Sequence, residues 1–263
     1  MILFVFEGKD ESYVFKTIEH LFFSKRRNRL ICCFNQNIYE LFRLMQESDF
    51  TEDIVSVIRD RRKFPEGNPL ADIVDVTDIS EVYLFFDYDF QNKNITLAEA
   101  NRQVGELLNF FNNENENGKL YVNYPMLESL RCTGELPDNN YWEYTVKRND
   151  CDDFKNWITV EYPFYKSMDF VVLPINKKKG ELRLKKVSIE QKEKLMQNWQ
   201  HLKTQNVSKA NFICTGRNEM PQKKEDVAQG IIFENQLTKF VNTDECCVSI
   251  LNAFPLFLYD YFK

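Results

Sequence analysis

Residues 2–12 read "ILFVFEGKDES", and this stretch decides the fold class. Five consecutive apolar residues (2–6) show no polar alternation, which is typical of a strand buried on both faces. Gly8 follows the run, and apolar residues then recur at helical spacing from Tyr13 to Phe22. The first unit is therefore predicted to be a strand, a turn and a helix.

The same alternation of strand and helix continues to about residue 130. Further strands are predicted at 30–34, 81–90 and 119–127, with helices in "IYELFRLM", "TEDIVSVIRDRR" and "TLAEANRQVGELLNFF" between them. Strands that alternate with helices indicate an α/β fold with a mainly parallel sheet flanked by helices. We therefore expect an α/β domain over residues 1–130.

Residues 131–263 have a different pattern and are predicted to form a mostly helical extension for binding substrate or a partner. Helices are expected at 188–203 and 233–241. The chain then reaches "SILNAFPLFLYDYF" (249–262), which is predicted to be a core helix. A dimer or partner surface is the alternative for this segment, because exposed apolar patches mark interfaces.

Composition narrows the class of protein. The chain has 263 residues, of which 43% are apolar and 14% aromatic, which is enough for a sizeable core. No apolar stretch approaches the roughly 18–20 residues of a membrane span, so no membrane association is expected. Seven cysteines include no CxxC pair, and no leader sequence is evident, so a reducing cytoplasm is expected and a zinc site is not.

The net charge of −6 does not by itself favour nucleic acid as a partner. Four basic runs nevertheless occur, at residues 24–29, 59–63, 177–186 and 221–225. Each is more often a solvated surface, but together they leave room for a basic groove.

Acidic residues follow the predicted strands. Glu7 comes after the first strand, Asp87 and Asp89 lie at the end of the third, and Glu128 lies just beyond the fourth. Ligands of an open parallel sheet bind beyond the carboxyl ends of its strands. The two aspartates, two residues apart, would share a face on an extended chain, and a flexible loop after the strand would let them converge on one ion. Taken singly, each acid has a simpler explanation as a helix cap or turn residue, Asp10 and Glu11 included.

A cluster of carboxylates at one edge requires compensation of its charge by protons, cations or metal ions. Oxygen donors suit Mg²⁺ or Mn²⁺, and no set of soft ligands is evident in the sequence. The pattern therefore predicts a magnesium or manganese site.

The stretches "FVFEGKDES" and "VYLFFDYD" resemble the TOPRIM domain, whose hallmark is Glu-Gly after the first strand and Asp-x-Asp after a later one. The continuation "NYPMLESL" is similar to a later Glu motif in TOPRIM proteins of the OLD nuclease type and in related proteins of phage defence. The resemblance covers about half the chain. A long separation between the two motifs, and a second half without a readable catalytic motif, depart from the family pattern.

The resemblance implies roles for individual residues. Asp87 and Asp89 would hold the principal ion, and Glu7 would be a metal ligand or general acid–base. Glu11 and Glu128 are candidate ligands of a second ion, since two ions can activate water and stabilise a leaving oxygen. Further assignments are Gly8 for the tight turn and Lys9 for neutralising charge in the transition state, with a solvated Lys9 as the alternative.

These roles indicate a metal-dependent nuclease that hydrolyses DNA or RNA, tRNA included, as the effector or toxin of a bacterial anti-phage defence system. Tryptophans and Tyr-rich stretches would stack on unpaired bases, although core packing is the better expectation for them. The chain has no GxxxxGK[ST] motif, so an ATPase would be a separate partner. The alternatives are a non-catalytic TOPRIM-fold binding or regulatory subunit, with the acids far apart or paired to Lys and Arg, and a nucleotidyl transferase.

Overall fold

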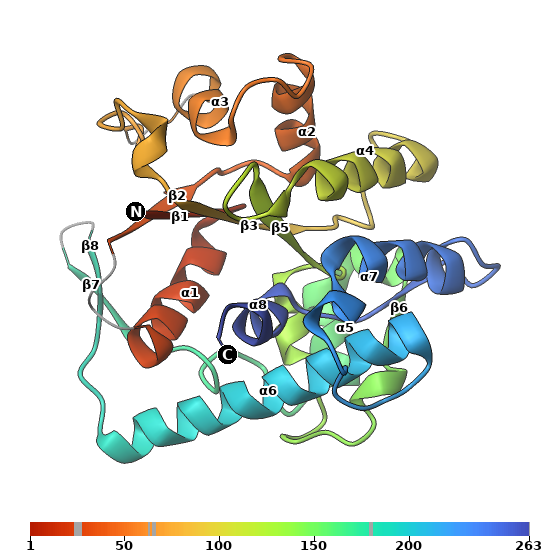
Figure 1. Ribbon diagram of the computed structural model, residues 1–263. Helices are drawn as coiled ribbons and strands as arrows, with labels where there is room; N and C mark the ends of the chain where they lie inside the picture. The colour runs from red at the N-terminus through yellow and green to blue at the C-terminus, as the bar shows by residue number, and fades with distance from the viewer. Residues whose placement is uncertain (24–27, 63, 65–66, 179–180, 263) are drawn as a thin grey trace.

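The computed structural model describes residues 1–23, 28–62, 64, 67–178 and 181–262. Its central feature is a five-stranded sheet in the order β2-β1-β3-β5-β4 (Figure 1). The strands are β1 (Ile2–Phe6), β2 (Arg29–Cys33), β3 (Glu81–Asp87), β4 (Asn112–Asn113) and β5 (Gly118–Asn123). Every neighbouring pair is parallel except β4 and β5, which are antiparallel. The predicted mainly parallel sheet is therefore confirmed.

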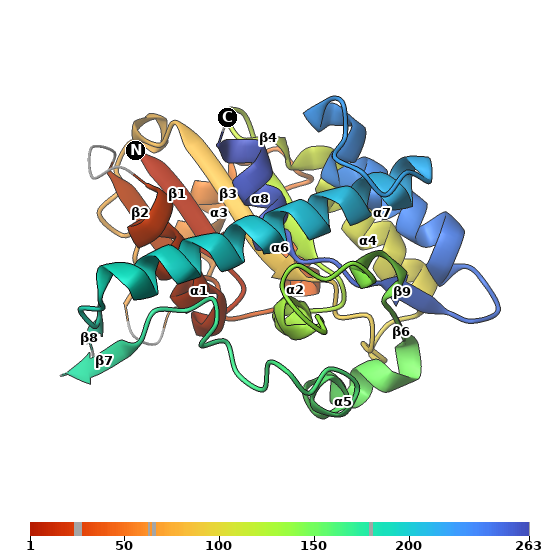
Figure 2. The same cartoon turned by 90° about the horizontal axis from the view of Figure 1, so that it is seen from below.

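Helices cover both faces of this sheet, as Figure 1 shows. One face carries α2 (Ile38–Gln46), α3 (Ile54–Arg61) and α4 (Leu97–Phe110), and the other carries α1 (Lys9–Phe22) and α8 (Ala253–Tyr261). The long helix α6 (Ile189–Thr215) packs against α8 and runs across the molecule below it (Figure 2). The predicted helices of the first half are all present.

The C-terminal part is mostly helical, as expected. It also contains α5 (Phe154–Glu161) and α7 (Gln229–Gln236), the latter continued by a π-helical turn at Leu237–Val241. Two antiparallel ribbons join β6 (Thr145–Lys147) to β9 (Cys247–Ser249) and β7 (Ile175–Lys178) to β8 (Glu181–Leu184). Short 3₁₀ helices are η1 (Val76–Asp78), η2 (Leu127–Arg131), η3 (Tyr141–Glu143), η4 (Arg148–Asp153) and η5 (Lys224–Val227).

Helix α8 belongs to the core of the sheet. The Phe254 ring stacks on Phe85 of β3 with 4.9 Å between centroids, and Phe257 lies 5.3 Å from the same ring. All three side chains have no exposed area. The prediction of a core helix in residues 249–262 is confirmed, and one apolar core extends across residue 130.

Two strand ends differ from the sequence prediction. The third strand stops at Asp87 rather than at residue 90, because Asp89 has a φ of 50°, which a strand cannot continue through. The fourth stops at Asn123 rather than at residue 127, because Tyr124 leaves the sheet and bridges to Leu251. Glu128 therefore lies on η2, five positions beyond the strand.

One C-terminal helix is longer than predicted and another begins earlier. The helix expected at 188–203 continues to Thr215, since Val207, Ala210 and Ile213 extend its buried face at spacings of three residues. Gly216 then ends it with a φ of 81°, a left-handed conformation that glycine adopts at low cost. Helix α7 begins at Gln229, four residues before the predicted start.

No helix in the described part of the chain is both long and apolar enough to cross a membrane. Parts of three predicted basic runs, at residues 24–27, 63 and 179–180, lie outside the described residues.

Candidate active site at the carboxyl edge of the sheet

Glu7 is fixed at the carboxyl edge of the sheet by its neighbours. It follows β1, and its backbone N–H donates to Phe85 O at 3.0 Å while its carbonyl accepts from Asn35 N at 2.6 Å. Its side chain is half-buried. The carboxylate Oε2 accepts a 2.9 Å hydrogen bond from the backbone N–H of Asp87. The predicted meeting of the first and third strand ends is therefore confirmed.

Asp87 is held by a buried amide. Asn123 lies opposite Asp87 in the β3–β5 register, and its Nδ2 donates to Asp87 Oδ1 at 2.9 Å. The Oδ1 of Asn123 accepts from Ala253 N at 2.9 Å, at the start of α8. Because Asn123 is fully buried, this bridge ties the carboxylate to both the sheet and α8.

Glu11 faces the same edge from the first turn of α1. Its Oε2 accepts a 3.0 Å hydrogen bond from Gly8 N, and the residue is 6% exposed. Glu11 thus also acts as an N-terminal cap, as the simpler interpretation expected. Gly8 has a φ of −141°, which any residue adopts, so conformational freedom does not explain the glycine. A Cβ there would come within 3.2 Å of Glu11 Oε2, so a larger residue at this position would crowd that carboxylate.

Asp89 lies in a tight turn after the strand, so the two aspartates do not share one face of an extended chain. The alternative expectation, a loop after the strand, describes the position of Asp89. Its left-handed backbone is tolerated because Asp is one of the few residues that visit this region. Tyr39 Oη donates to the carbonyl of Tyr88 at 2.8 Å, and Gln91 Nε2 donates to Asp89 Oδ1 at 3.1 Å. Burial raises the pKa of Asp89, and the side chains of Gln91 and of Asn37, the N-cap of α2, oppose that rise.

The electrostatics of Glu7 and Asp87 reflect crowding. Burial raises the pKa of Glu7 well above its usual value, and the charges of Asp89 and Glu11 raise it further. Burial likewise raises the pKa of Asp87, with added repulsion from Glu7 and Glu11. The bonds from Asp87 N and Asn123 oppose these effects without cancelling them.

The other two carboxylates behave in the same way. Burial raises the pKa of Glu11, with contributions from Asp10 and Glu128, and burial raises the pKa of Asp89. Among the described residues, the set Glu7, Glu11, Asp87 and Asp89 includes no member of an ion pair. We call these four residues the acid cluster. Crowded carboxylates of this kind repel one another unless protons or cations compensate their charge.

Glu128 is placed beside the acid cluster but is paired. Its Oε1 lies 2.5 Å from the Nζ of Lys155 on α5, and this hydrogen bond raises the pKa of Lys155. The negative charges of Asp10 and Asp87 raise it further. Lys155 is thus a cation that contacts a candidate carboxylate. The predicted Lys9 is exposed on the first turn of α1.

The donor set fits a hard divalent cation by its chemistry. The acid cluster offers only carboxylate oxygens, which are the ligands that such cations prefer. One oxygen of Glu7 and one of Glu11 each accept a hydrogen bond from a backbone amide, and the second oxygen of each takes no part in those two bonds. Within the described ranges, no three Asp, Glu, His or Cys side chains are already grouped closely enough to hold a metal ion. Binding one ion would therefore require rotation of side chains in the cluster.

Sequence reasoning missed three polar residues of this edge. Asn37 and Asn123 follow β2 and end β5, so the rule that located the acids would also have found these amides. Lys155 had no such signal, because only the packing of α5 beside η2 brings it to Glu128.

Comparison with known proteins gave no significant match among protein-family models, curated proteins or solved structures. The TOPRIM resemblance therefore depends on Glu7, Gly8, Asp87 and Asp89 and on their places at the strand ends.

Proposed function

We propose that this protein is a Mg²⁺- or Mn²⁺-dependent nuclease of TOPRIM type that hydrolyses phosphodiester bonds. The observation that carries the proposal is the acid cluster: four half-buried or buried carboxylates from two strand ends and one helix, with raised pKa values and no ion-pair partner among the described residues. Structural acids are normally paired or solvated. Perturbed groups gathered at a strand edge are typical of functional sites.

The residues have separable tasks in this proposal. Asp87 and Asp89 would hold the principal ion, with Glu11 and then Glu128 as ligands of a second. A bound ion would supply an activated water and neutralise charge on the phosphodiester. Glu7, whose pKa is raised by burial, would take up a proton and return it to water. Asn123 orients Asp87, and Lys155 is available to neutralise phosphate charge after it leaves Glu128.

The biological role is proposed on the resemblance alone: an effector of anti-phage defence in the cytoplasm, restrained by a separate ATPase or by dimerisation. A non-catalytic binding or regulatory subunit is the second candidate. It predicts acids paired with Lys or Arg, which describes Glu128 but not the acid cluster. The cluster therefore favours catalysis.

A cleavage assay on single-stranded DNA, plasmid and total tRNA with Mg²⁺ or Mn²⁺ tests the proposal. Wild type is compared with Glu7→Gln and Asp87→Asn, and Glu193→Gln on the exposed surface of α6 is the matched control. We expect metal-dependent cleavage by wild type and the control, and loss of at least about 10²-fold in the two cluster variants. Equal silence of all four proteins with every substrate, also with a co-encoded ATPase, would favour the binding subunit.

A further inference from the structure

The turn that follows β3 contains two unfavourable features. Asp89 has a φ of 50°, and Asn92 N donates to Asp89 O at 2.8 Å to close the turn. The Nε2 of Gln91 donates to Asp89 Oδ1, but its buried Oε1 accepts no hydrogen bond in the described part of the chain. A left-handed aspartate and a buried acceptor without a donor both disfavour this conformation, so contacts from elsewhere must stabilise it.

Arg148 supplies such contacts from the other half of the chain. Its Nε donates to Phe90 O at 2.9 Å and its Nη2 donates to Asn92 O at 2.7 Å. One planar guanidinium thus bridges the carbonyls of the residues on either side of Gln91. Arg148 is itself fixed directly after β6, where its backbone N–H donates to Cys246 O at 3.0 Å.

Asp89 is therefore held on both sides. Tyr39 of α2 donates to the carbonyl that precedes it, and Arg148 donates to two carbonyls that follow it. A further contact joins Lys93 Nζ to Asp152 Oδ2 at 2.5 Å, but both side chains are largely exposed, and exposed ion pairs contribute little. Arg148 is thus the main contact of the extension with this turn.

Charge pairing does not explain the place of Arg148. Among the described residues it belongs to no ion pair, although it holds a turn that carries a carboxylate. Burial raises the pKa of Tyr39, the charge of Asp89 raises it further, and the charge of Arg148 lowers it. Both charges thus act on one hydroxyl, while the donors of Arg148 bind backbone carbonyls and fix the shape of the turn.

We propose that Arg148 is a positioning residue for the acid cluster: by holding the turn, it keeps the Asp89 carboxylate where it can share a divalent cation with Asp87. The role rests on the metal site of the proposed function. It also gives the extension a task at that site, because the first half of the chain has no equivalent of this guanidinium at Phe90 O and Asn92 O.

Position and charge have opposite effects on ion binding. A positive charge near the site repels a cation, so removal of the Arg148 charge alone would strengthen binding of Mn²⁺. Loss of the position of Asp89 would weaken it, as commonly follows when a group that orients a metal ligand is removed. The sign of the change therefore distinguishes the two.

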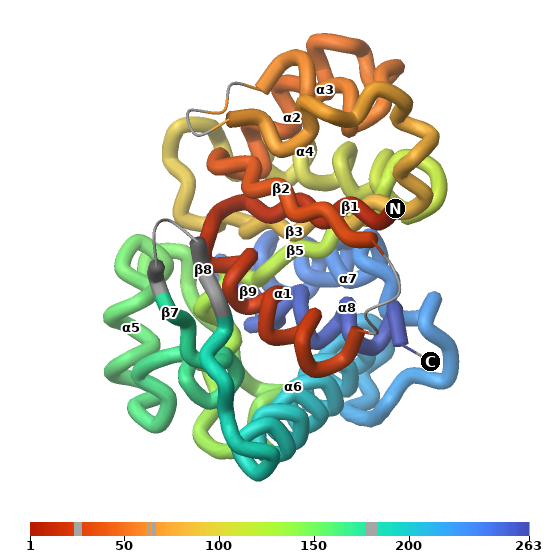
Figure 3. Tube along the Cα trace, turned by 90° about the vertical axis from the view of Figure 1, so that its left-hand side faces the viewer, coloured from red at the N-terminus to blue at the C-terminus, as the bar shows by residue number. Residues whose placement is uncertain are grey.

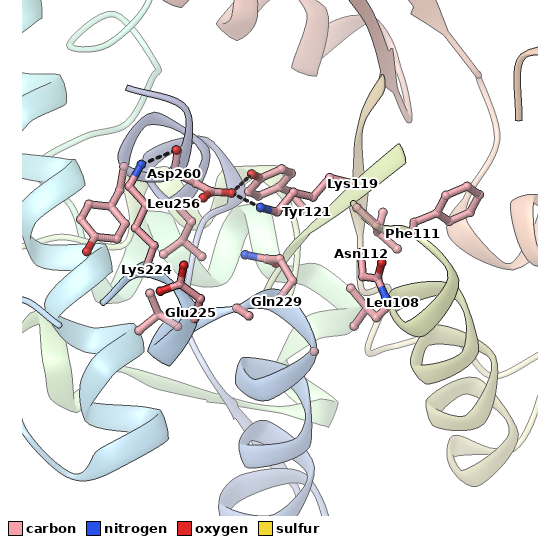
Figure 4. Close-up of a pocket in the computed structure, with 15 residues that line it drawn as sticks. Leu108, Phe111, Asn112, Lys119, Tyr121, Lys224, Glu225, Gln229, Leu256 and Asp260 are labelled. Carbon is pink, nitrogen blue, oxygen red and sulfur yellow. Dashed lines mark hydrogen bonds and ion pairs between the residues drawn. The ribbon is translucent and has the colours of Figure 1, made fainter. Parts of the chain in front are cut away.

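Three variants separate these effects. Arg148→Met removes the charge and both hydrogen bonds. Arg148→Lys keeps the charge, but a single ammonium does not reproduce the planar fork that reaches both carbonyls. Asp260→Asn is the control for a general loosening of the extension, because the Asp260 carboxylate joins α8 to Lys119 and Tyr121 of β5 (Figure 4).

Two measurements are made on the full chain of each protein. Calorimetry measures binding of Mn²⁺, and mass spectrometry measures hydrogen exchange of residues 88–92 without metal. We expect Arg148→Met to bind Mn²⁺ about 10- to 100-fold more weakly than wild type and to exchange these residues faster. Arg148→Lys should change both quantities in the same direction, and it decides the test if Arg148→Met does not fold. Asp260→Asn should match wild type in both.

Mn²⁺ binding by the Arg148 variants that equals or exceeds that of wild type would overturn the proposal, as would unchanged exchange of residues 88–92. Equally weak binding by Asp260→Asn would also overturn it, because loosening of the extension would then be the cause. Failure of the proposed function gives different results. Absence of Mn²⁺ binding by wild type would overturn the metal site together with the role of Arg148, whereas binding without cleavage would overturn the nuclease alone.

Discussion

The carboxylate of Glu7 accepts a 2.9 Å hydrogen bond from the backbone N–H of Asp87, a residue 80 positions further along the chain. This bond joins the ends of two neighbouring parallel strands and brings two acids with raised pKa values together. An arrangement that concentrates like charge is unfavourable for folding, and functional sites commonly have this property.

Asp87→Asn is expected to stabilise the protein while abolishing cleavage. The amide removes one of the crowded charges and can still accept from Asn123 Nδ2. We expect the free energy of unfolding at pH 7 to rise by about 1 kcal/mol, as for other substitutions that relieve an unfavourable functional site. Urea denaturation measures it. A clear loss of stability would show that the Asp87 charge has a structural partner.

The gain in stability of Asp87→Asn over wild type is expected to increase with pH. The pKa of Asp87 is raised on folding, so the ionised group disfavours the folded state once the pH rises above the unfolded value of about 3.9. Its favourable contribution is complete below that pH and is lost as the pH rises through the folded-state pKa. Denaturation from pH 4 to 8 should therefore show wild type and Asp87→Asn converging at pH 4 and diverging above it.

Glu99→Gln is the control for this pH dependence, because the pKa of Glu99 is lowered in the folded state and not raised. The bond from Arg102 lowers the pKa of Glu99 to about 2, so its charge favours the folded state above pH 4. The variant should be slightly less stable than wild type at pH 7 and equal to it at low pH. If Asp87→Asn and Glu99→Gln changed stability in the same direction with pH, the effect would come from removing any carboxylate and not from the site of Asp87.

Divalent cations are expected to stabilise the chain through the acid cluster. A ligand that binds only the folded state raises its stability by about 2.7 kcal/mol at a concentration one hundred times Kd. Thermal unfolding with Mg²⁺ or Mn²⁺ should therefore show an increase in Tm for wild type and Glu193→Gln. The increase should be absent in Glu7→Gln and Asp87→Asn. An equal increase in all four proteins would place the ion elsewhere.

Removal of an aromatic ring from α8 is expected to destabilise the whole sheet. Phe257 is fully buried and contacts Phe4, Tyr83 and Phe85. Phe257→Ala should reduce the free energy of unfolding by about 3–5 kcal/mol, as for other buried aromatic residues. Phe164→Ala, at a side chain that is 74% exposed, should change it by less than about 0.5 kcal/mol.

Truncation of the chain tests whether residues 1–130 fold without α8. A chain that ends at residue 130 lacks Phe254 and Phe257, which cover β3 and β5 from the α8 side. We expect it to fail to give a cooperative unfolding transition. A stable, cooperative 1–130 fragment would establish the first domain as independent of the extension.

The extension was difficult to place from the sequence. In Figure 3, α5, α6, α7 and α8 all lie on the far side of the sheet from α2 and α3, and α6 packs against α8. The pattern of residues 249–262 predicted a core helix, but periodicity does not say which surface a helix covers. That choice depends on complementary packing, here between Phe254 and Phe85.

The sequence by itself determined the alternation of strands and helices over the first half of the chain, because burial on both faces leaves an uninterrupted apolar run such as 2–6. It also determined that Glu7 and Asp87 lie at one edge, because parallel strands end on the same side. Only the tertiary structure decided the left-handed turn at Asp89, the approach of Lys155 to Glu128, and the two hydrogen bonds from Arg148 to that turn. Each of these depends on contacts between segments far apart in the chain, whose geometry is set by packing rather than by local residue pattern.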